Sequence, residues 1–442
     1  MPAHKLEQVY SFFKNRPVNL QNFEELYAPA DRGRGKSVPF QRIKRRLYED
    51  PEGSLKMLFA GHKGCGKTTE MVRLQRDIQD DFVVLNFSAV KELDILNIGY
   101  IEIFIAAMSK LFQFVEEEKD IQIAPIYLKN ILNWLKSREI EEINEKYMGM
   151  GMETEAGGGV DIPFLAKFFA RFSASAKSSS SLKEVLKQKV EPKLSDLIFH
   201  CNRLITEIKN QRPGNKNGLV IIFEDLDKMD LQKGEEIFYR HAVQLTQLHC
   251  HCIFTFPLAL LYNTGFNAIK VSYDEDFVLP MIKVYQKEGG ENPDGMQVME
   301  EIVKKRMDLS LFEDISILKD MIRYSGGCLW DLFEMIKDAS DSALDFGREK
   351  INREDYQSAF QALKRTYEFT IAENKAKGIT VDQYFETLKS CAMDANKKPK
   401  STDILLDLRN NRTVLSYNDV HWSDVHPVVR AILQEKGLIP HA

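Results

Sequence analysis

Short apolar runs alternate with stretches of helical periodicity along most of the chain. The runs have the length of strands that are buried on both faces of a sheet. They lie at residues 55–60, 82–87, 219–224, 251–256 and 276–284. Because strands that alternate with helices form parallel sheets with right-handed crossovers, this pattern predicts an α/β fold.

Apolar residues at helical spacing fill the segments around these strands. Two such patterns, at 4–14 and 39–49, precede the first strand. About 130 residues separate the second strand from the third, which is far more than an ordinary crossover needs. This insertion is periodic at 97–117, 123–145 and 182–210. A helical block follows the last strand, at 296–307, 315–325, 328–347 and 353–373, with Asn352 as the expected N-cap of its last helix.

The tail of the chain has a different character. Helical patterns at 381–394 and 401–408 precede alternating residues at 410–418 and a last helix at 425–436. We therefore divide the chain into four parts. They are a helical lead-in (1–50), a core (51–290) with a helical insertion (90–210), a helical lid (291–373) and a C-terminal domain (374–442).

A glycine-rich loop follows the first strand directly. It matches G-x-x-x-x-G-K-[ST], and the apolar spacing after Lys67 predicts the helix that this motif requires. Its glycines let successive N–H groups face one point, and the helix aims its positive end at the same point. The sequence thus predicts a cradle for the phosphates of a nucleoside triphosphate. Its residues are Gly61, His62, Lys63, Gly64, Cys65, Gly66, Lys67, Thr68 and Thr69.

Side chains of this loop and of the third strand are expected to complete the site. Lys67 would reach the β- and γ-phosphates, and the Thr68 hydroxyl would ligate Mg²⁺. Glu224 and Asp225 end the third strand, at the edge where open α/β sheets bind ligands. We expect Glu224 to hold the metal and Asp225 to polarise the attacking water, although either acid can be the one on the metal side. Asp227 belongs to the site or caps the next helix.

These motifs resemble those of P-loop ATPases of the additional-strand class, near the AAA+ and STAND families. The E-D-x-D ending at Glu224 is similar to that of STAND-type and KAP-type ATPases, and origin-recognition ATPases share the general layout. The resemblance implies ATP and Mg²⁺ as cofactors, ATP hydrolysis and a homo-oligomer. It also places Asp31–Gly35 at the adenine pocket. In such families a polar residue ending the next strand reads the γ-phosphate; Thr255 is the candidate, and a plain strand-ending threonine is the alternative.

One position departs from the family pattern. The segment Ser325–Ile336 is similar to the sensor 2 segment, where an arginine follows two glycines, but Trp330 stands at the arginine's place. Either another arginine such as Arg323 substitutes, or hydrolysis is slow. Arg240 and Arg306 are candidates for an arginine finger that acts on a neighbouring subunit, with surface or helix-end charges as the alternative.

Two further segments are candidates for binding a partner. The C-terminal domain resembles a winged helix, and similar modules bind DNA or protein. In the loop at 146–181, aromatic residues lie beside Lys167 and Arg171. They dock on a partner, a membrane or a nucleic acid, or they pack back on the insertion, which we favour because the apolar stretch is short. Phosphate contacts or a solvated loop are the alternatives for the basic cluster of Lys397, Lys398, Lys400, Arg409 and Arg412.

Composition limits these interpretations. The 442 residues are 44% apolar and 28% charged, which is typical of a folded multidomain protein. The formal net charge of −5 excludes a basic surface over the whole molecule, so nucleic-acid contacts would be local. Without a long apolar run or a signal-peptide core, we expect a cytoplasmic protein with reduced cysteines. Zinc binding by His249–Cys252 is not expected, since alternate residues of a strand face opposite ways.

Two classes of function remain. The first is an ATP-driven switch that assembles with nucleotide and acts through DNA or an effector protein, in phage defence by family resemblance. The second is a nucleotide-binding scaffold or DNA-binding adaptor that does not hydrolyse ATP.

Overall fold

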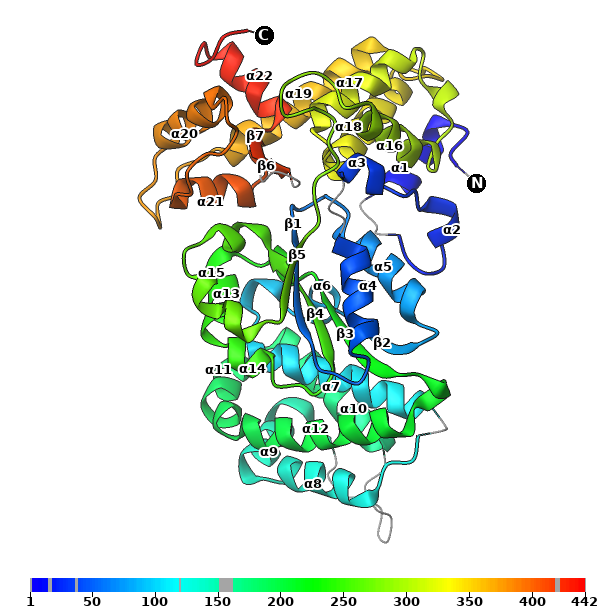
Figure 1. Cartoon of the computed structure of the whole chain (residues 1–442), viewed down its shortest axis with the longest axis vertical. Coiled ribbons are helices and arrows are strands. Elements are labelled where there is room, and N and C mark those ends of the chain that lie inside the picture. The colour runs from blue at the N-terminus through cyan, green and yellow to red at the C-terminus, as the bar shows by residue number, and fades with distance from the viewer. Residues whose placement is uncertain are drawn as a thin grey trace.

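The computed structural model describes residues 2–14, 18–35, 39–118, 121–150, 162–417 and 422–441. A parallel sheet with the order β2-β3-β4-β1-β5 forms the centre of the core (Figure 1). Because β4 lies between β1 and β3, the order is the one expected of the additional-strand class, and the predicted α/β fold is confirmed. The strands are β1 (Lys56–Gly61), β2 (Phe82–Ser88), β3 (Gly218–Glu224), β4 (His251–Pro257) and β5 (Glu275–Val278).

The strands end close to where the apolar runs predict. Every residue of β3 and β4 is buried, as expected for central strands of a parallel sheet. The exception is β5, which is shorter than the apolar run at 276–284. Pro280 has no backbone N–H to donate and follows the strand closely, so the ladder cannot continue through it.

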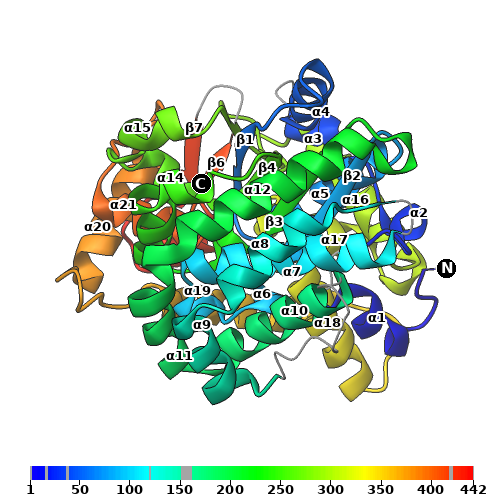
Figure 2. The ribbon, with the colours of Figure 1, turned by 90° about the horizontal axis from the view of Figure 1, so that it is seen from below.

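Helices cover both faces of the sheet. On one face lie α4 (Pro39–Glu49) and α5 (Lys67–Ile78), whose apolar residues pack with Phe59 and Val220. The other face packs against the insertion, chiefly α7 (Tyr100–Glu117) and α10 (Ile162–Ser178), which Figure 2 shows below the sheet. Short helices join the strands; they are α6 (Ala89–Glu92), α13 (Leu231–Glu235), α14 (Ala242–Leu245) and α15 (Phe266–Ile269).

The insertion is helical, as the periodicity predicts. Besides α7 and α10 it contains α8 (Pro125–Leu135), α9 (Arg138–Ile143), α11 (Ser180–Val185) and α12 (Leu194–Gln211). The aromatic segment after residue 161 forms α10, where Phe168, Phe169 and Phe172 are buried. Phe169 stacks on Phe112 of α7 with 5.0 Å between ring centres. The aromatics therefore pack back on the insertion; the part of this loop at 151–161 lies outside the described residues.

The helical lid contains α16 (Pro293–Lys304), α17 (Ile315–Ser325), α18 (Leu329–Asp345) and α19 (Arg353–Thr370). Asn352 caps α19 in a full capping box, as predicted. The first helix, α1 (Leu6–Phe13), packs on α18, and Ala3 pairs with Met307. The start of the chain thus belongs to the lid, while α2 (Phe23–Leu26) and α3 (Asp31–Arg34) lead on to the core.

The C-terminal domain has the predicted order of helix, helix, ribbon and helix. Its elements are α20 (Val381–Met393), α21 (Asp403–Asn410), the antiparallel strands β6 (Val414–Tyr417) and β7 (Trp422–Val425), and α22 (Pro427–Glu435). In Figure 1 the ribbon lies beside the lid, near the end of β1. Within the described ranges, no helix combines the length and the apolar character needed to cross a bilayer.

Candidate nucleotide site

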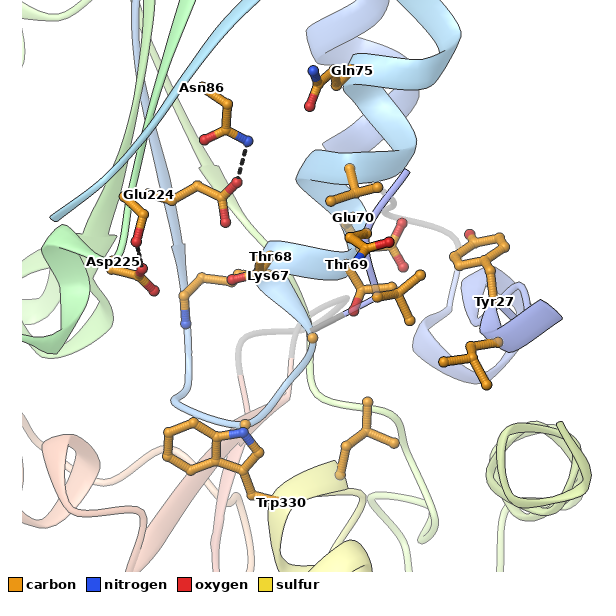
Figure 3. A pocket seen from close by; sticks show the side chains of 18 of the residues that line it. Tyr27, Lys67, Thr68, Thr69, Glu70, Gln75, Asn86, Glu224, Asp225 and Trp330 are labelled. Carbon is orange, nitrogen blue, oxygen red and sulfur yellow. Dashed lines mark hydrogen bonds between the residues drawn. The ribbon is translucent and has the colours of Figure 1, made fainter. Parts of the chain in front are cut away.

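A cavity of about 870 Å³ lies at the carboxyl edge of the sheet, between the core and the lid (Figure 3). Its core wall contains the glycine-rich loop, the start of α5 and the ends of β2 and β3. The segment at 18–34 and the lid helices α16 and α18 close the opposite side. The loop residues that line the cavity are Lys63, Gly64, Gly66, Lys67, Thr68 and Thr69, while Gly61, His62 and Cys65 lie behind them.

The loop has the conformation of an anion cradle. Gly64 and Gly66 have φ angles of +81° and +98°, in the left-handed region that favours glycine. A Cβ atom at Gly64 would lie 3.0 Å from the Cβ of Trp330, so the close approach of the lid also requires glycine. Helix α5 begins at Lys67, directly after the loop, and presents its N-terminus to the cavity.

The side chain of Lys67 points back into the protein. Its Nζ donates to the carbonyls of Gly61 at 2.7 Å and His62 at 2.9 Å and forms an ion pair of 2.8 Å with Asp227. Burial acts to lower the pKa of Lys67, but the combined effect of Asp227, Cys65 and Asp225 exceeds it, so the pKa of Lys67 is raised. Lys67 is therefore charged and close to the cavity, as a phosphate ligand must be.

The two predicted acids line the same cavity as the loop. Asn86 donates to Glu224 at 2.5 Å, and Ser88 donates to Asp225 at 2.5 Å, so strand β2 orients both carboxylates. Burial raises the pKa of Glu224 to about 7, although hydrogen bonds from Asn86 and Thr68 act in the opposite direction. Asp225 also forms an ion pair of 2.7 Å with Lys228.

Asp227 lies in the wall of this cavity and does not cap the next helix. Its carboxylate binds Lys67, whereas Asp230 caps helix α13 by accepting from the backbone N of Lys233 at 2.8 Å. The backbone of Asp225 is left-handed, with φ of +68°, which turns the chain so that Asp227 faces the loop. The third acid of the E-D-x-D ending was the only sequence signal for this contact.

Thr255 lies outside this cavity. It is fully buried, donates to the carbonyl of Phe223 at 3.1 Å and accepts from the backbone N of Leu226 at 2.9 Å. Both bonds hold the turn that carries Asp225. In this structure Thr255 therefore contacts the backbone around the acids, which agrees with the alternative of a plain strand-ending threonine.

The arginines singled out in the sequence have three different settings. Arg323 forms ion pairs with Glu291 and Asp320 and does not reach the cavity, so it is no substitute at the place of Trp330. Arg306 lines the cavity of its own chain and is only 7% exposed, which rules out contact with a neighbouring subunit in this conformation. Arg240 is exposed, and its role stays a prediction.

The far end of the cavity was largely missed by sequence reasoning. It is lined by Leu26, Tyr27, Ile302 and Phe333, so the end of the cavity away from the phosphate cradle has an apolar and aromatic wall. Arg34 ties this wall to the loop by donating to the carbonyl of Cys65 at 2.7 Å. Arg34 belongs to the segment Asp31–Gly35 that the family resemblance places at the adenine pocket, whereas the scattered apolar residues of this wall carry no motif.

The donor set fits Mg²⁺ bound together with phosphates. Thr68, Glu224 and Asp225 offer a hydroxyl and two carboxylates, and Mg²⁺ commonly takes one or two carboxylates plus phosphate oxygens and water. Across the described ranges, no three His, Cys, Asp or Glu side chains gather as a metal site of their own. The segment His249–Cys252 was considered above for zinc. The ring of His251 accepts a hydrogen bond from the backbone N of Leu55, while the thiols of Cys250 and Cys252 contact each other, so these side chains do not converge on one point.

The chain is similar over nearly its whole length to several solved structures. The Pyrobaculum aerophilum Cdc6p is 11% identical, covers 97% of this chain and 97% of its own length, and has a TM-score of 0.40. A Walker-type ATPase of Pyrococcus abyssi is 12% identical, with coverages of 96% and 99% and a TM-score of 0.43. The Aeropyrum pernix ORC2 protein with ADPNP and ADP is 11% identical, with coverages of 97% and 98% and a TM-score of 0.39. No family model and no curated protein matches the sequence.

Proposed function

We propose that this protein is an ATP-binding and ATP-hydrolysing molecular switch. The observation that carries the proposal is the shared cavity, in which the glycine cradle at 61–69 faces the carboxylates of Glu224 and Asp225. The loop amides and the α5 N-terminus would hold the phosphates, and the apolar far end suits a base.

The polar residues of the sequence motifs then have distinct roles. Thr68 and Glu224 would hold Mg²⁺, with Asp225 beside them as the residue that orients and polarises water. Lys67 binds phosphate after exchanging its bond to Asp227 for one to the nucleotide. Thr255 positions the turn of Asp225 rather than contacting the ligand.

We further propose a cytoplasmic protein that forms homo-oligomers with nucleotide and acts on DNA or an effector protein. The winged-helix-like C-terminal domain would carry the partner, and phage defence is the setting that the family resemblance implies. The basic cluster is smaller than predicted, because Arg409 and Arg412 pack inward and Lys397 pairs with Asp424 at 2.7 Å. Lys398 and Lys400 remain exposed.

Steady-state phosphate release tests the proposal. We expect turnover by the wild-type protein and its loss in Lys67→Ala and Asp225→Asn, while the matched control Asp230→Asn, at a helix cap outside the cavity, keeps it. Tight ATP retention without turnover would instead favour the scaffold, for which Trp330 at the arginine's place is the supporting observation. Measuring the size of the protein in solution with and without ATP tests assembly. We expect ATP to increase the oligomer size of the wild-type protein but not that of Lys67→Ala.

A further inference from the structure

The C-terminal domain contacts the glycine-rich loop directly. The Nε2 atom of His62, within the loop, accepts a hydrogen bond of 2.8 Å from the backbone N of Ser416 on β6. A backbone N–H can only donate, so this bond requires the ring to be unprotonated at Nε2. Burial, reinforced by the charge of Lys67, keeps it so by lowering the pKa of His62 to about 3.

A second contact runs through Trp330. The indole packs on the glycine turn, since a Cβ atom at Gly64 would lie 3.0 Å from its Cγ, and Figure 3 shows the ring beneath the turn. The backbone N of Leu329 donates to the carbonyl of Gly64 at 3.1 Å. The guanidinium of Arg412, from the turn between α21 and β6, lies 5.5 Å from the indole centre. Trp330 thus joins the loop to a cation of the C-terminal domain.

Arg412 is held firmly in this position. Its Nη1 donates to Asp331 at 2.9 Å and to the sulfur of Cys328 at 3.1 Å. The buried Asp331 also binds Tyr367 at 2.6 Å and His426 at 3.1 Å, so the lid and the C-terminal domain share one polar network. The backbone at Arg412 has φ of +66°, a conformation uncommon for residues other than glycine, which these contacts maintain.

We propose that Arg412 and Ser416 are positioning residues for the phosphate end of the site, and that they couple its nucleotide state to the C-terminal domain. Trp330 stands where the family pattern has an arginine and carries no charge itself. In this protein Arg412 of the C-terminal domain provides the positive charge, and its contact with the loop is made by the indole of Trp330. A triphosphate and a diphosphate fill the loop differently. They therefore favour different positions of the loop and of the His62 and Trp330 side chains that contact the C-terminal domain. By linkage, a partner bound to the C-terminal domain changes nucleotide affinity by the same factor as nucleotide changes affinity for the partner. This inference rests on the proposed nucleotide site.

Calorimetric affinities for ATP and ADP, measured with Mg²⁺ on the whole chain, test the inference. We expect Arg412→Ala to reduce the ratio of ATP to ADP affinity about tenfold, and Arg412→Lys to restore part of it, because charge remains over the ring. Arg430→Ala is the matched control: this arginine of α22 pairs with Asp424 at 2.5 Å within the C-terminal domain and should leave the ratio unchanged. An unchanged ratio in Arg412→Ala overturns the inference.

A second variant covers the case in which Arg412→Ala fails to fold, since that change deprives the buried Asp331 of a partner. Trp330→Leu leaves the Arg412–Asp331 pair intact and should lower the same ratio. When both variants fold, their effects should not add, because both break one connection; additive effects contradict the coupling. If the wild-type protein binds neither nucleotide, the proposed function itself fails. If the wild-type protein binds both and the variants keep its ratio of ATP to ADP affinity, only this inference fails.

Discussion

The Nζ of Lys67 lies 2.8 Å from the Oδ2 of Asp227, and both side chains are less than a tenth exposed. Phosphate must compete with this carboxylate for the lysine. We therefore expect Asp227→Asn to raise affinity for ATP and ADP, on the order of tenfold or about 1.4 kcal/mol, because it removes the competing charge. Calorimetric titration of the two proteins measures the change.

The same substitution should make the ligand-free protein less stable, since it leaves Lys67 charged and buried without its partner. Asp230→Asn is the control, because it removes a carboxylate three positions along, at a helix cap outside the cavity. Asparagine caps helices as well as aspartate does, so this change should leave both stability and nucleotide affinity nearly unchanged. Equal nucleotide affinity in Asp227→Asn and the wild type would show that the ion pair does not compete with phosphate.

Thr255 provides a test of positioning without ligand contact. In Thr255→Val the backbone N of Leu226 loses its acceptor inside the protein, at a cost of about 1–3 kcal/mol. We expect a lower rate of phosphate release and a lower melting temperature, with nucleotide affinity nearly unchanged. A selective loss of ATP affinity relative to ADP would instead mean that the hydroxyl contacts the terminal phosphate.

His62 predicts how stability depends on pH. Its pKa is lowered to about 3 in the folded protein, so between pH 6.5 and 3 the unfolded chain binds a proton that the folded chain does not. This residue therefore makes unfolding easier as pH falls through that window, by at most about 1.4 kcal/mol per pH unit. Urea unfolding between pH 4 and 7 should show a flatter dependence for His62→Gln, whose amide oxygen can still accept from Ser416. Parallel curves for the two proteins would contradict this assignment.

Arg306 is expected to act at the far end of the cavity. Its guanidinium donates to the carbonyls of Leu26 and Ile302, lies over the ring of Phe333, and forms no ion pair with any described residue. Burial lowers its pKa to about 10. Arg306→Met should lower the affinities for ATP and for ADP by the same factor, about tenfold. The reason is that Arg306 would donate to a part of the nucleotide that both ligands share.

Direct binding measurements with both nucleotides check this expectation. Hydrolysis by Arg306→Met that recovers on mixing with Lys67→Ala protein would show instead that the arginine serves a neighbouring subunit.

Local patterns predicted the elements of the fold well. The periodicity at 315–325 coincides with α17, and Asn352 forms the expected cap, because helix limits depend on neighbouring residues and caps. The apolar runs located all five strands, and the glycine motif placed Lys67 and Thr68 at a cavity.

Contacts between distant segments could not be predicted in this way. Whether Asp225 or Asp227 faces Lys67 depends on a left-handed turn at Asp225. Aspartate adopts this conformation more often than most residues other than glycine, but most aspartates do not, so the residue type alone does not predict the turn. The inward position of Arg412 depends on Asp331, which belongs to a different part of the chain. A basic residue in a tail has the same appearance in a sequence whether it meets solvent or a buried carboxylate.

The bond from Ser416 to His62 joins positions 354 residues apart. A ribosome that adds 5–20 residues per second needs on the order of 20–70 s to pass from one to the other. Strands β2 to β5 of the central sheet are synthesised during this interval, yet the glycine loop still lacks its last support. A nascent chain therefore acquires this support of its phosphate cradle only when its final domain has been synthesised.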